Sequence, residues 1–373
     1  MTRTVSLVLV DPAGTLLGAL PPFPVSTPWW QEVAEIVAAT GVTVLRLLHA
    51  DRPHPHGGHI TYLAETDTRP EGLIPAGADL APHPHRAPYA EVGGPAASLA
   101  WAAGALDRIG VTGTTAHQQR TWNLSAIWRL DAPDGTPAAW LKQVPSFFRH
   151  EPAVLRLVDN VAPGLVPYVL AAGDAGRMLL AHVPGDDLYG AGPEICDEIA
   201  AAFHPVQEHF AGRVDELLAA GVPDRRLSVD RLIDVAKPFI SDMSGLSNLI
   251  YGLPDRLADV AACGLPDTLV HGDFHSGNAR TGPVIVDWGD SCVGNPALDV
   301  LRLSDDPAVL RDWAARWPGT DALRAVDLLR PVAALEQAAA YAGFLSRIEP
   351  SEWPYHAGDV PERLAAAVET AGP

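Results

Sequence analysis

The residues of this chain whose types and spacing are best suited to chemistry lie in HGDFHSGN at 271–278 and in DWGD at 287–290. Together they supply a carboxylate at Asp273, an amide at Asn278 and a second carboxylate at Asp287. Transfer of a phosphoryl group needs a carboxylate that orients the attacking hydroxyl and oxygen ligands that hold Mg²⁺ against the phosphates. These three side chains therefore form a coherent set for phosphoryl transfer.

Apolar residues flank both parts of this motif and predict two short strands, LVHG and PVIVDWG, that bracket it. A loop between strands can bring an Asp, an Asn five residues further on and an Asp at the end of the next strand into one small volume. We therefore expect one site from the three residues. For Asp290, binding of a second metal or of a cationic substrate group competes with a plain turn-capping role.

HGDFHSGN followed by VIVDWGD resembles the catalytic and metal-binding motifs of the aminoglycoside phosphotransferase and choline kinase family, which shares the protein-kinase fold. The resemblance covers roughly residues 110–345. It implies that Asp273 is the catalytic base and that Asn278 and Asp287 bind Mg²⁺. It further implies structural support of the site by three residues: His271, Gly272 and Asp299.

A kinase-like nucleotide site also needs a strand lysine on the phosphates and a helix glutamate that holds this lysine. Lys142 in WLKQV and Glu151 in EPAVLRLV occur in the right order before the motif. MLLAHVPGDDL at 178–188 resembles the hinge between two lobes, where the backbone from Ala181 to Val183 would contact the nucleotide base. The resemblance thus implies ATP or GTP as the phosphoryl donor.

The loop expected over the phosphates, QRTWNLSA at 119–126, contains no glycine. Thr121, Asn123 and Ser125 are candidate donors to phosphate oxygens, although alternating polar residues on a strand also suit a solvent-facing edge. Neither a Walker A sequence nor GxGxxG occurs in the chain, which argues against a P-loop kinase and a dinucleotide enzyme.

The first hundred residues predict a small α+β unit. Strands are expected at 4–10, 42–48 and 59–65, and a helix over 27–40 with Thr27 as its cap and Gly41 as its stop. The order faintly resembles a Nudix domain, but Ala38 and Ala39 stand where paired catalytic glutamates are expected. Glu32 and Glu35 remain without the motif's context, so we interpret this degenerate Nudix-like unit as non-catalytic.

The predicted fold class is α+β, a bilobal protein-kinase-like fold preceded by this small domain. The expected parts are the α+β domain at 1–100, a β-rich nucleotide-binding lobe at 101–183 and a mostly helical lobe at 184–373. Helical periodicity dominates after residue 190 and supports the last assignment. The helical lobe would carry the catalytic loop and the acceptor site.

Acidic residues outnumber basic ones by 45 to 26, giving a formal net charge of −19. Such a charge repels nucleic acid and anionic membranes and favours a cationic small-molecule acceptor, although it also suits an adaptation for solubility. We expect no nucleic-acid or membrane partner. The apolar N-terminal run is too short for a signal peptide or a membrane span, and the three cysteines are widely spaced, so a cytoplasmic location is expected.

The resulting hypothesis is a kinase that transfers the terminal phosphoryl of ATP or GTP to a hydroxyl of a cationic acceptor. An aminoglycoside or related antibiotic would be such an acceptor, which would make the protein an antibiotic resistance enzyme. Asp186 and Asp187 are candidates to attract it. Two alternatives stay open: a metabolic kinase of an amino alcohol or sugar, and a non-catalytic binding module that keeps the kinase fold.

Overall fold

The computed structural model describes residues 2–372, and the chain forms two compact units. The sheet-rich unit comprises the residues up to Arg149 together with Val169–His182 and Gly343–Gly358. The helical unit comprises His150–Tyr168, Val183–Ala342 and the residues from Asp359 onward. These units differ from the predicted three parts, because 150–168 belong to the helical unit and 343–358 to the sheet-rich one. The three-part division and the Nudix likeness stay predictions.

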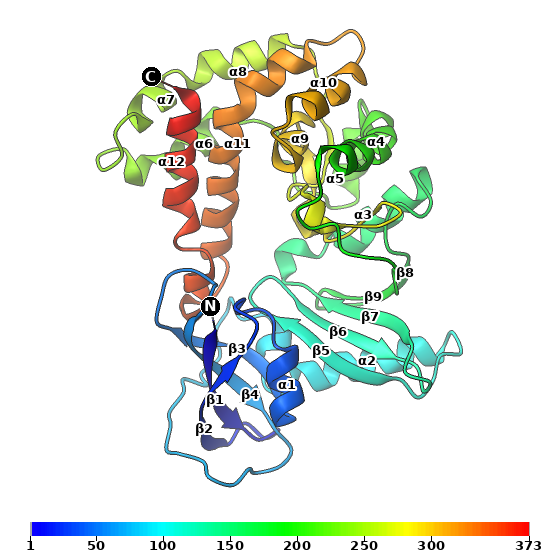
Figure 1. Cartoon of the computed structure of the whole chain (residues 1–373), viewed down its shortest axis with the longest axis vertical. Coiled ribbons are helices and arrows are strands. Elements are labelled where there is room, and N and C mark those ends of the chain that lie inside the picture. The colour runs from blue at the N-terminus through cyan, green and yellow to red at the C-terminus, as the bar shows by residue number, and fades with distance from the viewer. Residues whose placement is uncertain (1, 373) are drawn as a thin grey trace. The chain divides into compact units, whose positions relative to one another are not determined.

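The sheet-rich unit begins with a four-stranded sheet in the order β2-β1-β4-β3 (Figure 1). β1 and β2 form an antiparallel hairpin, β1 pairs with β4 in parallel, and β3 pairs with β4 antiparallel. Alternating residues of these strands, such as Leu7 and Tyr62, are buried in one core with the helix α1. The bounds are β1 Arg3–Val10, β2 Leu16–Val25, α1 Ala34–Thr40, β3 Thr43–Ala50 and β4 Gly58–Glu65.

The predicted helix over 27–40 is wrong in its first half, because α1 begins only at Ala34. The buried guanidinium of Arg3 accounts for the difference. It donates to the carbonyl oxygens of Trp29 at 2.7 Å, Trp30 at 2.9 Å and Glu32 at 2.7 Å. Carbonyls turned toward this side chain hold the segment before α1 as a loop. The predicted stop is confirmed, since Gly41 adopts the left-handed conformation at the C-cap.

A second sheet in the same unit has the order β5-β6-β7-β9-β8 (Figure 1). β6 and β7 form an antiparallel hairpin, and in its tight turn the Gly135 amide donates to the Ala132 carbonyl at 2.8 Å. The helix α2 packs its small residues, including Ala102 and Ala105, onto this sheet. The bounds are α2 Gly94–Asp107, β5 Thr115–Thr121, β6 Ala126–Asp131, β7 Pro137–Gln143, β8 Val169–Ala172 and β9 Arg177–Ala181.

Residues 343–358 pack into the sheet-rich unit far in sequence from their partners. The buried ring of Tyr355 lies edge-on to Trp30 at 5.5 Å and to Trp122 at 5.6 Å between ring centroids. The carboxylate of Glu352 accepts a hydrogen bond from the backbone of Leu47 at 2.9 Å. This segment is therefore part of the core of the sheet-rich unit.

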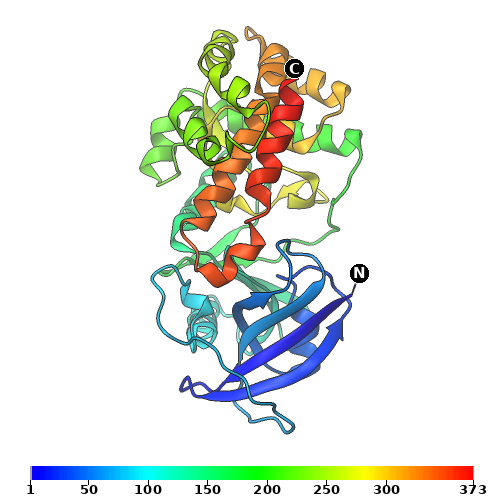
Figure 2. The same ribbon diagram turned by 90° about the vertical axis from the view of Figure 1, so that its left-hand side faces the viewer.

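The helical unit confirms the predicted helical character of the C-terminal half. α11 and α12 run side by side within it (Figure 2), and Arg363 of α12 donates to Gln337 of α11. No helix formed by residues 2–372 has both the length and the apolar composition needed to cross a membrane. The helices are α3 Glu151–Val161, α4 Pro193–Phe210, α5 Val214–Ala219, α6 Val229–Ala236, α7 Leu246–Tyr251, α8 Leu253–Ala262, α9 Ala297–Leu303, α10 Pro307–Ala315, α11 Ala322–Leu345 and α12 Asp359–Ala371.

Four short strands in this unit carry the polar motif. β10 pairs antiparallel with β13, and β11 pairs antiparallel with β12. Their bounds are β10 Thr268–Val270, β11 Ala279–Arg280, β12 Val284–Ile285 and β13 Cys292–Gly294. The two strands that were predicted to bracket the motif are confirmed as β10 and β12.

Candidate active site

The loop 271–278 runs from the end of β10 to the start of β11, and its central carboxylate is Asp273. The Asp273 side chain is 36% exposed. Its Oδ1 accepts from Arg302 on α9, with Nε at 3.0 Å and Nη2 at 2.9 Å. Its Oδ2 accepts from the side-chain amide of Asn278 at 3.2 Å. The carboxylate is thus fixed by two neighbours and still open to solvent.

The imidazole of His275 is a third neighbour of this carboxylate. The Gly277 amide donates to His275 Nδ1 at 3.1 Å, so Nε2 carries the ring proton and faces Asp273 Oδ2 at 3.4 Å. Burial opposes ionisation of Asp273, but this hydrogen bond and the charge of Arg302 outweigh it and lower the pKa of Asp273 below its usual range. Asp273 is therefore an ionised carboxylate at neutral pH.

Asn278 is oriented so that its amide oxygen is available. Its Nδ2 donates both to the Asp273 backbone carbonyl at 2.8 Å and to the Asp273 carboxylate at 3.2 Å. These two bonds fix which end of the amide faces Asp273. The Oδ1 atom consequently points away from Asp273, where it can serve as a ligand.

Asp287 is brought to the loop by the residue before it. The Val286 amide donates to the Asn278 carbonyl at 2.8 Å, and the Val286 carbonyl accepts from His271 Nε2 at 3.0 Å. Asp287 itself is exposed and has φ 63° and ψ 63°, a left-handed conformation that costs a non-glycine residue about 1 kcal/mol or more. Strain of this kind is concentrated at functional sites.

The buried carboxylate of Asp299 on α9 holds the backbone at the start of the loop. This buried carboxylate accepts from the amides of His271 at 2.9 Å and Gly272 at 3.0 Å, and from Gln207 Nε2 at 3.2 Å. Burial raises the pKa of Asp299 to about 7, against the opposing effect of the two backbone hydrogen bonds. Burial also lowers the pKa of His271 to about 4, so its ring is neutral, as its hydrogen bonds require.

Gly272 is a loop position that a side chain cannot occupy without displacing a neighbouring backbone. Its φ is +85°, and a Cβ atom there would lie 2.3 Å from the carbonyl oxygen of Asp290. That backbone belongs to the short helical turn after Asp287, so the two parts of the motif touch at this glycine. The loop can therefore approach the backbone of Asp290 closely because Gly272 has no side chain.

The donor set at the loop fits Mg²⁺. Within residues 2–372, no group of three or more His, Cys, Asp or Glu side chains is arranged to hold a metal. A site built from the Asn278 amide oxygen and the Asp287 carboxylate would have two protein ligands and an otherwise open shell. Mg²⁺ is commonly bound in this way, with water and substrate phosphates completing its octahedron.

The predicted nucleotide-binding residues are divided between the two units. Lys142 is buried in the middle of β7, and Ala181 ends β9. The Ser125 side chain is also buried, and its hydroxyl accepts from Trp122 Nε1 at 3.1 Å. The unit boundary falls between His182 and Val183, inside the segment predicted as the hinge.

Two other predicted residues have partners that bear on their roles. Glu151, the buried first residue of α3, accepts from the Trp288 amide at 3.1 Å, which anchors the residue after Asp287. Asn123 donates to the Glu352 carbonyl at 3.4 Å and bonds His356 Nε2 at 2.8 Å. Asn123 is thus engaged in the interior of the sheet-rich unit rather than on a solvent-facing edge.

The sequence motif left Arg302 and His275 without roles, although both contact Asp273. A signal for Arg302 exists in the spacing, because residues three apart on a helix share a face. Asp299 faces the loop, so Arg302 on the same helix faces it as well. His275 lies inside the motif, but its contact depends on the conformation of the loop.

Comparison with known proteins identifies the relatives of this arrangement. The model of the phosphotransferase enzyme family (APH) matches residues 142–341, which include the whole motif. A search of curated proteins found no match.

Solved structures share the fold. A choline/ethanolamine kinase family protein from Mesorhizobium loti is 19% identical, with 74% of this chain and 95% of that chain covered and a TM-score of 0.53. The macrolide 2'-phosphotransferase MphH from Brachybacterium faecium is 16% identical, with 72% and 97% covered and a TM-score of 0.51. The APH(2")-IIIa protein, in complex with GDP and kanamycin, is 16% identical, with 73% and 98% covered and a TM-score of 0.51.

These likenesses confirm the predicted fold class, a protein-kinase-like α+β fold with a sheet-rich N-terminal part and a helical C-terminal part. The family match extends over more than half of the chain and includes the loop that holds Asp273, Asn278 and Asp287. The chain belongs to the phosphotransferase enzyme family (APH).

Proposed function

We propose that the protein transfers the terminal phosphoryl group of ATP or GTP to a hydroxyl of a small, cationic acceptor. One observation carries the proposal: the ionised Asp273 carboxylate, the free oxygen of the Asn278 amide and the exposed Asp287 are tied to one loop. This is the set of groups that phosphoryl transfer to a hydroxyl needs. A non-catalytic binding module would have no need to keep all three in place.

In this proposal Asp273 orients the acceptor hydroxyl and takes its proton as the hydroxyl oxygen bonds to the terminal phosphorus and the nucleoside diphosphate leaves. Arg302 and His275 hold the carboxylate in one orientation through Oδ1 and Oδ2, respectively. Mg²⁺ bound by Asn278 and Asp287 would supply positive charge that offsets the charge of the phosphates. Asp299 supports the loop by accepting from two of its amides.

We assign the nucleotide to Lys142, Glu151, Ser125 and the backbone from Ala181 to Val183. Lys142 is buried in β7 of the sheet-rich unit, and Glu151 is buried at the start of α3 in the helical unit. A GDP complex of one structural neighbour makes GTP a donor to test beside ATP. A cytoplasmic location, where such donors are found, belongs to the same proposal.

The cationic character of the acceptor rests on two aspartates beside the loop. The Asp186 carbonyl accepts from the Thr281 amide at 3.1 Å, and the next segment bonds through Leu188 to the Ala279 carbonyl at 3.1 Å. Asp186 and Asp187 are thereby fixed beside β11, directly after Asn278, and both are exposed. With a net charge of −19 the protein attracts cations. An antibiotic with several amino groups fits, and resistance would then be its role.

The test is phosphoryl transfer from ATP and from GTP to a panel of aminoglycosides, macrolides, amino alcohols and neutral sugars, with products identified by mass spectrometry. Asp273→Asn, which keeps the size of the side chain, is the catalytic control. A phosphorylated cationic product that the variant does not form supports the proposal. A neutral sugar as the best acceptor would refute the cationic class, and nucleotide binding without any transfer would refute the kinase assignment.

A double variant tests the acceptor class separately from catalysis. Replacing Asp186 and Asp187 together by Asn removes two negative charges and leaves the loop residues in place. We expect the KM of a cationic acceptor to rise about tenfold, with kcat and the KM of the nucleotide within about twofold. Equal effects on cationic and neutral acceptors would contradict the electrostatic role.

A further inference from the structure

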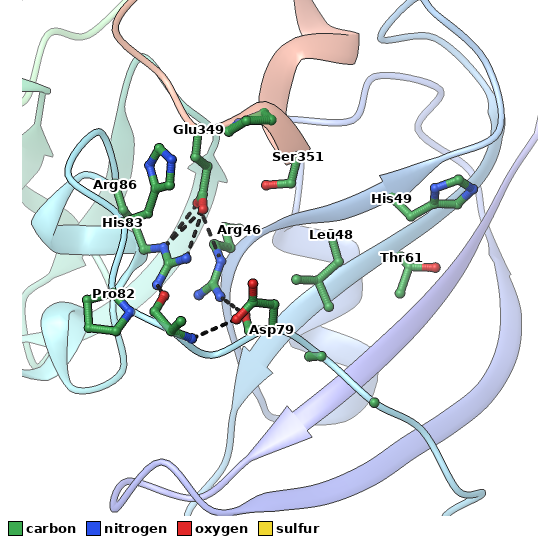
Figure 3. A pocket seen from close by; sticks show the side chains of 14 residues that line it. Arg46, Leu48, His49, Thr61, Asp79, Pro82, His83, Arg86, Glu349 and Ser351 are labelled. Atoms are coloured by element: carbon green, nitrogen blue, oxygen red, sulfur yellow. Dashed lines mark hydrogen bonds and ion pairs between the residues drawn. The ribbon is translucent and has the colours of Figure 1, made fainter.

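The sheet-rich unit contains a cavity, which the proposed reaction does not use (Figure 3). Its volume is about 530 Å³. Side chains of β3 and β4, the loop 77–86 and the segment 349–351 form its walls, so every lining residue belongs to the sheet-rich unit. The walls combine apolar groups such as Leu48 and Pro82 with several charged side chains. The size of this cavity lies within the range of small-molecule sites.

Three charged side chains are buried at one end of this cavity. The exposed fractions of the side chains are 2% for Arg46, 4% for Arg86 and 8% for Glu349. The Glu349 carboxylate lies between the two guanidinium groups, with Arg86 Nη2 at 2.9 Å and Arg46 Nε at 3.4 Å (Figure 3). Buried ions are costly unless each is compensated. Two buried positive charges share one buried negative charge, so one positive charge is in excess.

The other carboxylates nearby do not remove this excess. Glu91 lies 3.3 Å from Arg86 but is 43% exposed, and Asp79 is exposed and caps the Ala81 amide, so water screens both. Burial raises the pKa of Glu352 to about 8, which leaves that carboxyl mostly neutral at pH 7. The pKa of Arg46 is lowered by its burial and by the charge of Arg86. The end of the cavity is therefore electropositive.

Hydrogen-bond donors also remain available there. Each terminal guanidinium nitrogen carries two hydrogens. Arg46 donates from Nη1 to the Ala90 carbonyl at 3.2 Å and from Nη2 to the Asp79 carbonyl at 2.9 Å, which leaves one hydrogen on each nitrogen. The hydroxyl of Ser351 lines the same cavity, is buried and has no hydrogen-bond partner among the described residues. Buried polar atoms of this kind are usually satisfied, in many cases by a ligand or water.

We propose that this cavity binds a small phosphate monoester. Its phosphate would occupy the electropositive end against Arg46, Arg86 and Ser351, and its organic part would lie along Leu48 and Pro82. Guanidinium groups match the geometry of phosphate oxygens, and a dianion compensates more charge than a carboxylate does. The volume also exceeds what inorganic phosphate alone would fill. The site is separate from the catalytic loop, which belongs to the helical unit.

Binding would act on a segment that connects two helices. Glu349 and Ser351 lie in Gly343–Gly358, which follows most of α11 in sequence and leads directly into α12. A ligand that bonds Ser351 and the two arginines adds contacts between this segment and the strands β3 and β4. We expect it to protect the segment against proteolysis.

The experiment is calorimetric titration of the full chain, without nucleotide or Mg²⁺, using glycerol 3-phosphate as the probe. Inorganic phosphate, acetate and glycerol are the comparison ligands. We expect saturable binding of glycerol 3-phosphate, weaker binding of inorganic phosphate and acetate, and none of glycerol. Asp273→Asn should leave the affinity unchanged, because the catalytic loop takes no part.

Three cavity variants give results that a loss of folding cannot imitate. Ser351→Ala removes an unpartnered hydroxyl, so it should fold normally and weaken binding about tenfold. Arg86→Gln should weaken binding further. Glu349→Gln removes the competing carboxylate of the same ion pair and should tighten binding. Two variants that break one ion pair are thus expected to act in opposite directions.

Several results would overturn the proposal. Absence of binding by wild type would do so, as would binding that Asp273→Asn abolishes and Ser351→Ala does not change. Weakening by Glu349→Gln as large as that by Arg86→Gln would show that the ion pair serves the fold and not a ligand. Acetate binding as tightly as glycerol 3-phosphate would refute the phosphate assignment.

Discussion

The substitution Gly272→Ala tests whether close approach of the two halves of the motif sets the activity. The new Cβ would lie 2.3 Å from the Asp290 carbonyl oxygen, so the contact must open by about 1 Å to reach an ordinary van der Waals distance. A misplacement of about 1 Å at a catalytic centre costs about 10²-fold in rate. The left-handed φ of +85° adds about 1–2 kcal/mol of strain. We expect kcat to fall about 100-fold and stability by about 2–4 kcal/mol.

The assay is steady-state release of the nucleoside diphosphate, with urea unfolding measured on the same preparations. Gly190→Ala is the matched control, because Gly190 also has a positive φ, +72°, but nothing lies within 4 Å of its Cβ position. This control carries the strain without the clash and should keep kcat within about threefold. If folded Gly272→Ala retains the kcat of the control, the packing of the loop against Asp290 does not govern catalysis.

Three further predictions concern the carboxylates of Asp299 and Asp287 and the imidazole of His356. Asp299→Asn turns an amide donor toward a backbone N–H of the loop, so kcat should fall about 10–100-fold while the nucleotide affinity stays unchanged. An unaltered kcat would show that Asp299 does not support the catalytic loop. Asp287→Asn keeps the shape but loses the charge, so the Mg²⁺ concentration for half-maximal turnover should rise at least about tenfold; an unchanged requirement places the metal elsewhere. Burial lowers the pKa of His356 to about 3, whereas the pKa of an unfolded histidine is about 6.5. Between pH 6.5 and pH 3 the unfolded state therefore binds a proton that the folded state does not, so the wild-type protein loses stability as the pH falls through this range. His356→Gln lacks this loss, so its stability relative to wild type should rise by about 1.4 kcal/mol per pH unit of acidification, and parallel urea-unfolding curves against pH would contradict the assignment.

The motif was predictable because its chemistry is local. Asp273 and Asn278 lie in one eight-residue stretch, and the strand that leads to Asp287 pairs with the strand directly after Asn278. Short-range pairing of this kind follows from the apolar flanks alone. The residues that orient the Asp273 carboxylate were harder to predict from the sequence, because the contact of Arg302 with Asp273 depends on which face of α9 is turned toward the loop.

Elements governed by distant contacts were predicted poorly. α1 begins six residues later than its capping pattern indicates, because Arg3 bonds the carbonyls of the preceding segment. α2 was not predicted, since its Pro- and Gly-rich surroundings suggested a boundary between domains and its small residues give no clear periodicity. The contacts of Ala102 and Ala105 with the second sheet stabilise it. In both cases tertiary packing overrides the local signal.

The segment 343–358 shows the same limit at the level of domains. Its sequence continues an apolar helix, and nothing local indicates that Glu352 will bond the backbone of Leu47, 305 residues away.

Buried carboxylates have different consequences in the two units, although the same physical rule governs both. Asp299 accepts hydrogen bonds from two loop amides and from Gln207, and it holds the catalytic backbone. Glu349 instead divides one negative charge between two buried arginines, which leaves positive potential at the end of a cavity. A buried carboxylate that accepts from the catalytic loop therefore identifies structural support, whereas an incompletely compensated buried charge identifies a place where a ligand can supply the missing charge.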